Sequence, residues 1–359
     1  MTFDILLKDY QPQPELVTET HLVNKPMFPV IDGHNHIGLP FGHPWEDRPV
    51  KELLDLMDEA GVEVMVDLNG GFGEQYLIKH LDHFKKTAPE RFYVFGGVDM
   101  FQFAEKGNSF GDWAATEFRK QCGWGAQGLK VWKCFGLQVK DHTGRLIRVD
   151  DRRLDPLWDT AAELKVPVVI HVGDPAAFFR PLDATNERWE ELQHHPEWHF
   201  QSPPYPPLLE VLEGLRRLVK RHPRTTFIGA HVGCYAENLG WVARVLDEAP
   251  NFYVDISARL AELGRQPYTA REFFIKYQNR IVFGTDMGME LGIYRNYYRF
   301  LETYDEYFKY DIISEVPSEG RWFVYGIKLP PQVLKKVYQE NMRRLLLRPE
   351  QMASPAQKV

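Results

Sequence analysis

The segment Asp32-Gly33-His34-Asn35-His36, at the end of an apolar run, is the part of the sequence that points most directly to chemistry. Alternate side chains of a β-strand face the same way, so a strand here would turn Asp32, His34 and His36 to one side. Two neutral imidazoles at this spacing can bind one divalent metal ion, and the carboxylate of Asp32 could orient them from behind. For this motif alone the alternative is two histidines that only form hydrogen bonds.

Three later apolar runs also end in a residue that suits a metal site. The run at 168–170 leads to His171, the run at 227–230 leads to His231, and the run at 281–285 leads to Asp286. A single histidine at the end of an apolar strand is usually structural. Four histidines and an aspartate at the ends of successive strands are explained together by one metal site, if those strands end at the same rim.

The runs belong to a repeated architecture, in which a short apolar segment is followed by a longer amphipathic one. Helical patterns at 50–60, 154–164 and 208–221 each end near Gly or Pro just ahead of the next run. Most runs are continuous rather than alternating, as in parallel strands covered by helices. The pattern predicts a (β/α)8 TIM barrel with its site at the C-terminal strand ends, and a doubly wound open sheet is the alternative. The predicted strands are 30–36, 62–68, 92–98, 128–132, 167–172, 226–232, 252–257 and 281–286.

Three segments fall outside this repeat. Residues 1–28 are predicted to be an N-terminal extension that packs across the barrel, the metal-dependent barrel itself spans 29–348, and 349–359 is a C-terminal tail. Residues 176–207 form a long insertion after the fifth strand that is rich in aromatic residues and proline. Such an insertion is either a lid or wall of the site or a surface excursion with its own small cluster, and the sequence leaves both open.

Composition excludes several classes of protein. The formal charge of -7 argues against non-specific binding of nucleic acid and against a basic membrane-binding patch. No apolar run approaches the roughly 20 residues of a membrane-spanning helix. Three widely spaced cysteines suggest a reducing compartment, so a cytoplasmic location is expected. The expected partner is a small-molecule substrate, and a homodimer is one assembly that stays open.

The order of these motifs resembles a known family. The His34-Asn35-His36 motif, His171, His231 and the ending Gly284-Thr285-Asp286 are similar to the amidohydrolase superfamily. More narrowly, they resemble the amidohydrolase-related group that includes aminocarboxymuconate-semialdehyde decarboxylase. The likeness extends from Pro29 to Leu347 and leaves the N-terminal extension outside it.

The resemblance implies a role for each of these residues. His34, His36, His171 and Asp286 would bind one divalent metal ion, most suitably Zn²⁺, with Mn²⁺ and Fe²⁺ left open. The metal would lower the pKa of a water molecule, and Asp286 would accept its proton. His231 would activate the water or polarise the substrate. The alternative for His231 is a second-metal ligand with no role in proton transfer.

Lys130 decides whether one metal or two is expected. Binuclear members of the superfamily carry a carbamylated lysine on the fourth strand, whereas the decarboxylase-like group does not. Lys130 shares a strand face with Trp132 and could project into the barrel, where both could contact substrate. We expect Lys130 instead to pair with a buried acid such as Asp32 or Asp67, which favours a mononuclear site.

Two enzymatic functions and one non-enzymatic function follow from this site. The first is a metal-dependent hydrolase that attacks a carbonyl, in an amide or lactone, of a small acidic substrate. The alternative is a non-oxidative decarboxylase of an aromatic or muconate-type carboxylate. A catalytically silent barrel is the third, although unpaired polar groups buried without a metal would be costly. In either enzyme Arg259 could bind a substrate carboxylate, or it could pair with Glu262 on a surface turn.

Overall fold

The computed structural model describes residues 4–6, 9–10, 12–41, 44–312, 314 and 318–347. The predicted C-terminal tail at 349–359 therefore lies outside the described residues. Within them the strands are β1 (Val30–Asn35), β2 (Val62–Asp67), β3 (Phe92–Val94), β4 (Leu129–Val131), β5 (Val168–Ile170), β6 (Phe227–Gly229), β7 (Phe252–Asp255), β8 (Ile281–Val282), β9 (Phe308–Lys309) and β10 (Phe323–Val324).

The strands β1 to β8 form a closed parallel barrel. Two ladders, β1-β2-β3 and β4-β5-β6-β7-β8, are joined by a parallel bridge between Gly96 and Leu129. The barrel closes between β8 and β1, where Gly33 N–H donates to the Phe283 carbonyl at 2.9 Å and Asp286 N–H donates to the His34 carbonyl at 2.8 Å. The short strands β9 and β10 pair antiparallel outside the barrel. The predicted (β/α)8 fold is confirmed, and the open sheet is excluded.

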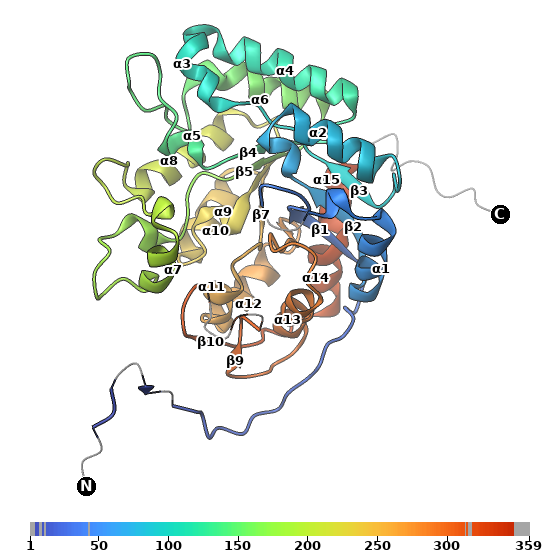
Figure 1. Cartoon of the computed structure of the whole chain (residues 1–359), viewed down its shortest axis with the longest axis vertical. Helices are drawn as coiled ribbons and strands as arrows, with labels where there is room; N and C mark the ends of the chain where they lie inside the picture. Colours follow the sequence, from blue (N-terminus) through green and yellow to red (C-terminus); the bar gives the residue numbers. More distant parts are fainter. Residues whose placement is uncertain are drawn as a thin grey trace, which may run out of the picture.

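Helices cover the outside of the barrel (Figure 1). The amphipathic patterns at 50–60 and 208–221 are confirmed as α1 and α8, whose apolar stripes are buried. The helices are α1 (Val50–Ala60), α2 (Glu74–His80), α3 (Phe103–Lys106), α4 (Phe110–Trp124), α5 (Cys134–Leu137), α6 (Asp155–Leu164), α7 (Trp189–His194), α8 (Leu208–Arg221), α9 (Ala230–Cys234), α10 (Leu239–Glu248), α11 (Leu260–Gly264), α12 (Pro267–Lys276), α13 (Leu291–Glu302), α14 (Pro331–Lys335) and α15 (Asn341–Leu346).

Several strands are shorter than the apolar runs predicted. The run at 226–232 becomes β6 followed by α9, in which residues 231–234 have φ values of 56°, 57°, 66° and 62°. The run at 281–286 keeps only two residues in β8, and Asp286 has φ 57°. The apolar character continues past each strand because the following turn is also buried. Periodicity alone therefore overestimates strand length at the rim where the site lies.

The segment before β1 runs as an extended chain along the outside of the barrel (Figure 1). The backbone N–H of His21 donates to Asp305 at 2.8 Å, and that of Met27 donates to Glu302 at 3.0 Å. Leu22 is nevertheless 82% exposed. Among the described residues no helix is long and apolar enough to span a membrane.

Candidate active site

His34, at the end of β1, is held by a carboxylate from β7, which pairs with β8 beside β1. Its Nδ1 lies 2.8 Å from Asp255 Oδ2 and 3.0 Å from Ser257 Oγ. An Nδ1–H donated to Asp255 leaves the lone pair of His34 on Nε2, which lies 3.7 Å from Asp286 Oδ1. The prediction that Asp32 orients the imidazoles is wrong, because Asp32 accepts the backbone N–H of His34 at 3.1 Å instead.

His36 is oriented in the same manner by a neutral partner. Its Nδ1 lies 2.7 Å from Asn69 Oδ1, just beyond β2, and its Nε2 lies 3.6 Å from Asp286 Oδ1. The pairing of β1 with β2 shifts register between Asp32 and Asn35. Both imidazoles of the motif nonetheless converge on Asp286, as their alternate positions along the strand predict.

His231 reaches the same point from a turn with unusual backbone geometry. Its Nδ1 lies 2.9 Å from the Ser257 carbonyl, so Nδ1 is a donor and Nε2 keeps the lone pair. That Nε2 lies 3.6 Å from Asp286 Oδ2. Both His231 and Asp286 have positive φ, which costs a non-glycine residue on the order of 1–3 kcal/mol and recurs at functional sites. The surrounding barrel must supply this energy in order to aim the two side chains at one another.

The geometry around Asp286 fits a single metal ion. One ligand atom from each of His34, His231 and Asp286 lies within 4.8 Å of the other two. Ligand atoms about 2.1 Å from a tetrahedral ion are about 3.4 Å apart, close to the imidazole–carboxylate separations here. Asp286 Oδ1 is buried and has no hydrogen-bond partner among the described residues. A buried carboxylate oxygen without a hydrogen bond and two imidazole lone pairs that face it together form the set of ligand atoms expected at a cation site.

Burial sets the protonation of these groups. It lowers the pKa of His36 and of His231 well below the usual value, so both imidazoles are neutral and able to bind a metal. It raises the pKa of Asp286, although the nearby His34 and Lys130 oppose that shift. The site therefore has neutral nitrogen ligands and a carboxyl group that holds a proton more readily than a surface aspartate.

His171 lies beside this group but is differently oriented. Its ring centroid is 4.4 Å from that of His231. Its Nε2–H donates to the Gly173 carbonyl at 3.0 Å and lies 3.2 Å from Asp174 Oδ1, so the lone pair is on Nδ1. Burial lowers the pKa of His171 to about 4, against the attraction of Asp174. Of the sequence-predicted ligands, His171 is the one whose Nε2 is directed away from Asp286.

Lys130 faces the site, and the prediction that it pairs with Asp32 or Asp67 is wrong. Its Nζ lies 3.1 Å from His34 Nε2 and 4.8 Å from the centroid of the Trp132 ring. Asp32 instead accepts the hydroxyl of Tyr294, and Asp67 binds His80. Burial lowers the pKa of Lys130 to about 8, although Asp286 and Asp255 oppose this. The Nε2 lone pair of His34 therefore faces the ammonium group of Lys130 in this structure.

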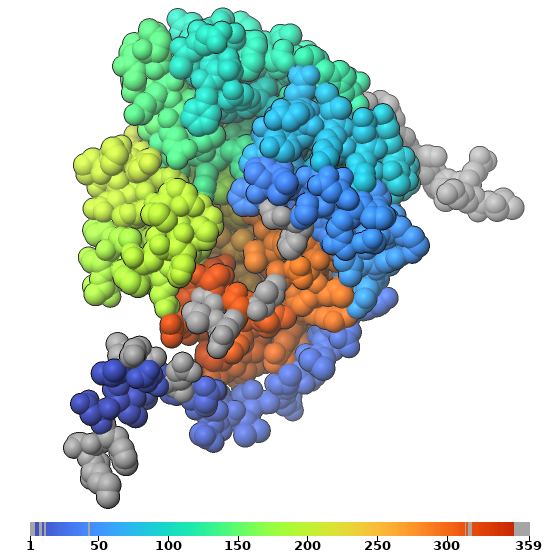
Figure 2. Space-filling model, viewed as in Figure 1, coloured from blue at the N-terminus to red at the C-terminus, as the bar shows by residue number. Residues whose placement is uncertain are grey.

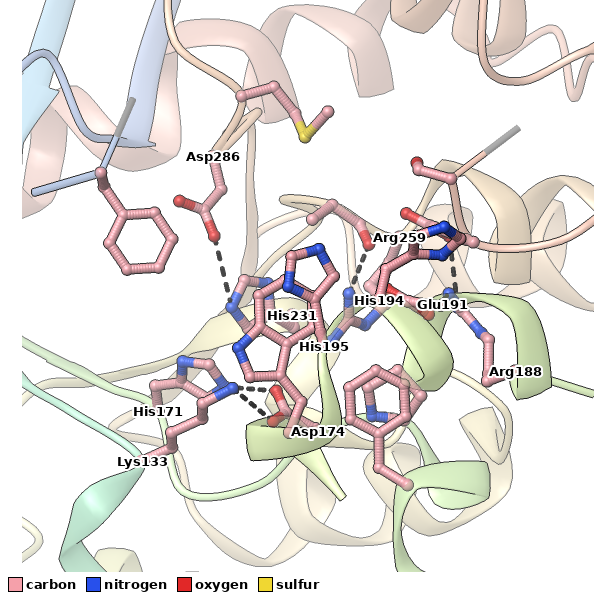
Figure 3. A pocket seen from close by; sticks show the side chains of 18 residues that line it. Lys133, His171, Asp174, Arg188, Glu191, His194, His195, His231, Arg259 and Asp286 are labelled. Carbon is pink, nitrogen blue, oxygen red and sulfur yellow. Dashed lines mark hydrogen bonds and ion pairs between the residues drawn. The ribbon is translucent and has the colours of Figure 1, made fainter. Parts of the chain in front are cut away.

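The cluster opens into a cavity of about 380 Å³ at the mouth of the barrel (Figures 2 and 3). His171, His231 and Asp286 lie on its inner side. The insertion at 176–207 provides much of the wall opposite, so it lines the cavity rather than forming a separate surface excursion. Its lining side chains are Phe178, Arg188, Glu191, His194, His195 and Trp198.

Arg259 lines the cavity, whereas Trp132 does not. Arg259 is 7% exposed, and its NH1 donates to the Ala258 carbonyl at 2.5 Å. The alternative pairing of Arg259 with Glu262 on a surface turn is wrong, because Glu262 is buried and is paired with Arg188. Trp132 stacks on Phe72 and on His36, with ring centroids 4.1 Å and 5.0 Å away, and so packs against one of the imidazoles of the site.

Two groups of polar residues near the site are not evident from the sequence motifs. Asn69 orients His36, and its signal is its position directly after a predicted strand, where polar side chains face the rim. Lys133 and Asp174 form an ion pair of 2.5 Å on the cavity wall. No sequence spacing relates this pair, because the two residues come from different loops.

Comparisons with known proteins agree with this fold. The model of the amidohydrolase family matches residues 125–348. The solved 2,6-dihydroxybenzoate decarboxylase from Rhizobium is similar to 89% of this chain and 99% of its own, with a TM-score of 0.55 and 17% identity. An uncharacterised TIM-barrel protein from Bordetella bronchiseptica aligns over 84% of this chain and 83% of its own, with a TM-score of 0.50 and 18% identity.

A second decarboxylase of known structure is similar to the chain to about the same degree. The dihydroxybenzoic acid decarboxylase from Polaromonas sp. JS666, solved with manganese and the inhibitor 2-nitroresorcinol, covers 91% of this chain and all of its own (100%), with a TM-score of 0.57 and 17% identity. At these identities the likeness establishes the fold and nothing finer. No curated protein matches the sequence.

Proposed function

The chain belongs to the amidohydrolase family, and from this premise we propose that it is a metal-dependent, non-oxidative decarboxylase of a small aromatic carboxylic acid. The observation that carries the proposal is a buried His–Asp cluster that opens into a cavity with aromatic walls and a buried arginine. From sequence alone hydrolysis came first and decarboxylation second. We place decarboxylation before hydrolysis because two structurally similar proteins are dihydroxybenzoate decarboxylases.

The cavity suits an aromatic acid in size and lining. Its volume of about 380 Å³ is near the lower end of the ~300–1,000 Å³ typical of ligand pockets, so a single-ring compound fits better than a peptide or an oligomer. Phe41, Phe178 and Trp198 line it and offer faces for a ring. Arg259 would bind the carboxylate of the substrate with two parallel hydrogen bonds.

One divalent metal ion would be held by His34, His36, His231 and Asp286, with His171 beside them. A donor set of imidazoles and a carboxylate suits Zn²⁺ and Mn²⁺ alike, and the manganese of the Polaromonas enzyme favours Mn²⁺ for the first trials. When bound, such an ion would polarise an oxygen of the substrate as a Lewis acid.

The residues of the chain would act in a fixed order. Arg259 holds the carboxylate, and the aromatic walls exclude water from the ring. Asp286 passes a proton to the ring carbon that bears the carboxylate. The bond from that carbon to the carboxylate then breaks, its electron pair restores the ring, and CO₂ leaves. Asp286 regains a proton from solvent, so one proton is consumed for each CO₂ released.

Hydrolysis of an amide or lactone is the second candidate, and one observation favours it. Asp286 and His231 approach within 3.6 Å, which would allow the pair to hold a water molecule and accept its proton. The same side chains therefore serve either reaction, and the substrate decides between them.

A substrate panel distinguishes the candidates. Mn²⁺-loaded and Zn²⁺-loaded protein is given hydroxybenzoates, muconate-type acids, lactones and aryl amides, while CO₂ release and incorporation of ¹⁸O from labelled water are measured. CO₂ release from a hydroxybenzoate, lost in the Asp286→Asn variant, supports the proposal. Turnover of a lactone or amide with ¹⁸O incorporation and no CO₂ from any acid refutes it. No turnover, with less than about half an equivalent of bound metal, indicates a silent barrel.

A further inference from the structure

One wall of the cavity carries a cluster of charged residues that the proposed reaction does not use. Arg188, from the insertion, is 1% exposed and lies among three carboxylates. Its NH1 donates to Glu191 at 2.8 Å, and its NH2 contacts Glu262 and lies 3.2 Å from Glu319 Oε2. Arg188, Glu191 and Glu319 line the cavity, and Figure 3 shows Arg188 beside Glu191, on the side away from His171.

Acidic groups are in excess in this cluster. The carboxylates of Glu191, Glu262 and Glu319 outnumber the guanidinium groups of Arg188 and Arg259. Glu319 Oε2 is buried and makes no hydrogen bond among the described residues, where its contact is the 3.2 Å ion pair with Arg188 NH2. Burial raises the pKa of Glu319 to about 7, although Arg188 opposes the shift. A buried acceptor left unpaired costs free energy that a bound donor would recover.

Arg259 provides an independent sign of a ligand in the same cavity. More than nine-tenths of its surface is buried. Within the described part of the chain, its guanidinium group donates a hydrogen bond to a backbone carbonyl, that of Ala258. No carboxylate lies within ion-pair distance of it there. The positive charge of Arg259 interacts electrostatically with His231 and Asp286 and also with the carboxylates of Glu262 and Glu319. A buried cation between the His–Asp cluster and the carboxylates around Arg188 is placed to bind an anionic group.

We propose that Glu319 forms a second subsite, which recognises a neutral hydroxyl or amino group on the substrate at the end remote from the carboxylate held by Arg259. This inference rests on the proposed function for the acid that Arg259 binds. Of the carboxylates around Arg188, Glu319 lines the cavity and has an oxygen, Oε2, that makes no hydrogen bond among the described residues, so it is placed to contact a ligand.

Other substituents suit this wall less well. A second carboxylate would be repelled by Glu191, Glu262 and Glu319, and an apolar group would leave Glu319 Oε2 without a hydrogen bond. The cavity therefore selects a monocarboxylic acid that bears a hydrogen-bond donor. Glu319 is a specificity-determining residue in this proposal and takes no part in the bond-breaking step.

Binding measurements test the subsite without requiring turnover. The probes are benzoate and benzoates with one hydroxyl, amino, methoxy or aminomethyl group at the meta or para position, titrated by calorimetry into Mn²⁺-loaded protein. We expect the best hydroxyl or amino probe to bind at least about tenfold more tightly than its methoxy counterpart. In Glu319→Leu this preference falls to less than about twofold, while the affinity for benzoate changes by less than about twofold.

Controls separate this proposal from the proposed function. Glu319→Gln keeps an acceptor and is expected to retain most of the preference, and Glu163→Gln, an exposed carboxylate on α6, is expected to retain all of it. An unchanged preference in Glu319→Leu, or a gain by the cationic aminomethyl probe alone, overturns the subsite. Preferential binding without any CO₂ release refutes the decarboxylase and leaves the subsite standing.

Discussion

Replacing Asp255 by asparagine tests whether the cluster binds a metal through oriented imidazoles. Asp255 Oδ2 accepts from His34 Nδ1 at 2.8 Å, and Oδ1 accepts the backbone N–H groups of His231 at 2.8 Å and of Ser257 at 3.1 Å. An asparagine side chain has one oxygen and one NH₂ group. The NH₂ group must therefore face either the Nδ1–H of His34 or the two backbone N–H groups, all of which are donors themselves. If the NH₂ faces His34, the imidazole moves its proton to Nε2 and loses the lone pair directed at Asp286.

The expected loss of metal affinity follows from the disturbance of one metal-binding histidine, His34. Loss of a partner that orients a metal-binding histidine typically costs about 10–100-fold in metal affinity. We expect Asp255→Asn to weaken Mn²⁺ binding by this factor, or about 1.4–2.8 kcal/mol. The reverse swap, Asn69→Asp, keeps an acceptor for His36 Nδ1, so we expect its affinity to stay within about threefold of the wild type.

Competition with a chromophoric chelator at pH 7.5 measures this affinity. Asp55→Asn is the matched control, since Asp55 is 60% exposed on α1 and contacts Lys51. Circular dichroism of the metal-free proteins checks that each variant is folded. Wild-type affinity in folded Asp255→Asn, or equal losses in Asp255→Asn and Asn69→Asp, would refute the reasoning, because the first outcome excludes the tautomer argument and the second excludes any dependence on the accepting oxygen.

Three further predictions follow from the site. His231→Ala should lose bound Mn²⁺ as well as turnover, because its Nε2 faces Asp286; metal analysis showing loss in His171→Ala alone would restore the assignment made from sequence. The metal-free protein should lose stability between pH 6.5 and 4, since His171 has a pKa of about 4 when folded against 6.5 when unfolded and the unfolded chain binds more protons in that interval. The free energy of unfolding falls by about 3 kcal/mol over this interval. A thermal midpoint that does not change with pH, or one that falls as steeply with pH in His171→Asn, would contradict the prediction. Arg259→Met should raise KM for the acid about 10–100-fold with a smaller change in kcat, as expected when a charge-assisted pair to the substrate is lost; an unchanged KM would remove Arg259 from the substrate site.

The barrel, and the rim at which the site lies, follow from local patterns in the sequence. Continuous apolar runs separated by amphipathic segments require parallel strands covered by helices, and such strands close into a barrel whose C-terminal ends meet. The alternation of side chains along β1 brings His34 and His36 to one face. The positions of His231 and Asp286 directly after strands then place both at the same rim. These are local consequences of periodicity and chain order.

The hydrogen-bond and ion-pair partners of these residues depend on contacts between distant parts of the chain. Lys130 was expected to pair with a buried acid, yet it faces His34, because Asp32 and Asp67 are already occupied by residues from other elements. Hydrogen bonds such as that between His34 and Asp255 join residues 221 positions apart, and the contact of Arg188 with Glu262 joins residues 74 positions apart. Local periodicity carries no information about which loop folds over which strand end. The orientation of the imidazoles and the lining of the cavity therefore follow from the packing of the loops across the barrel.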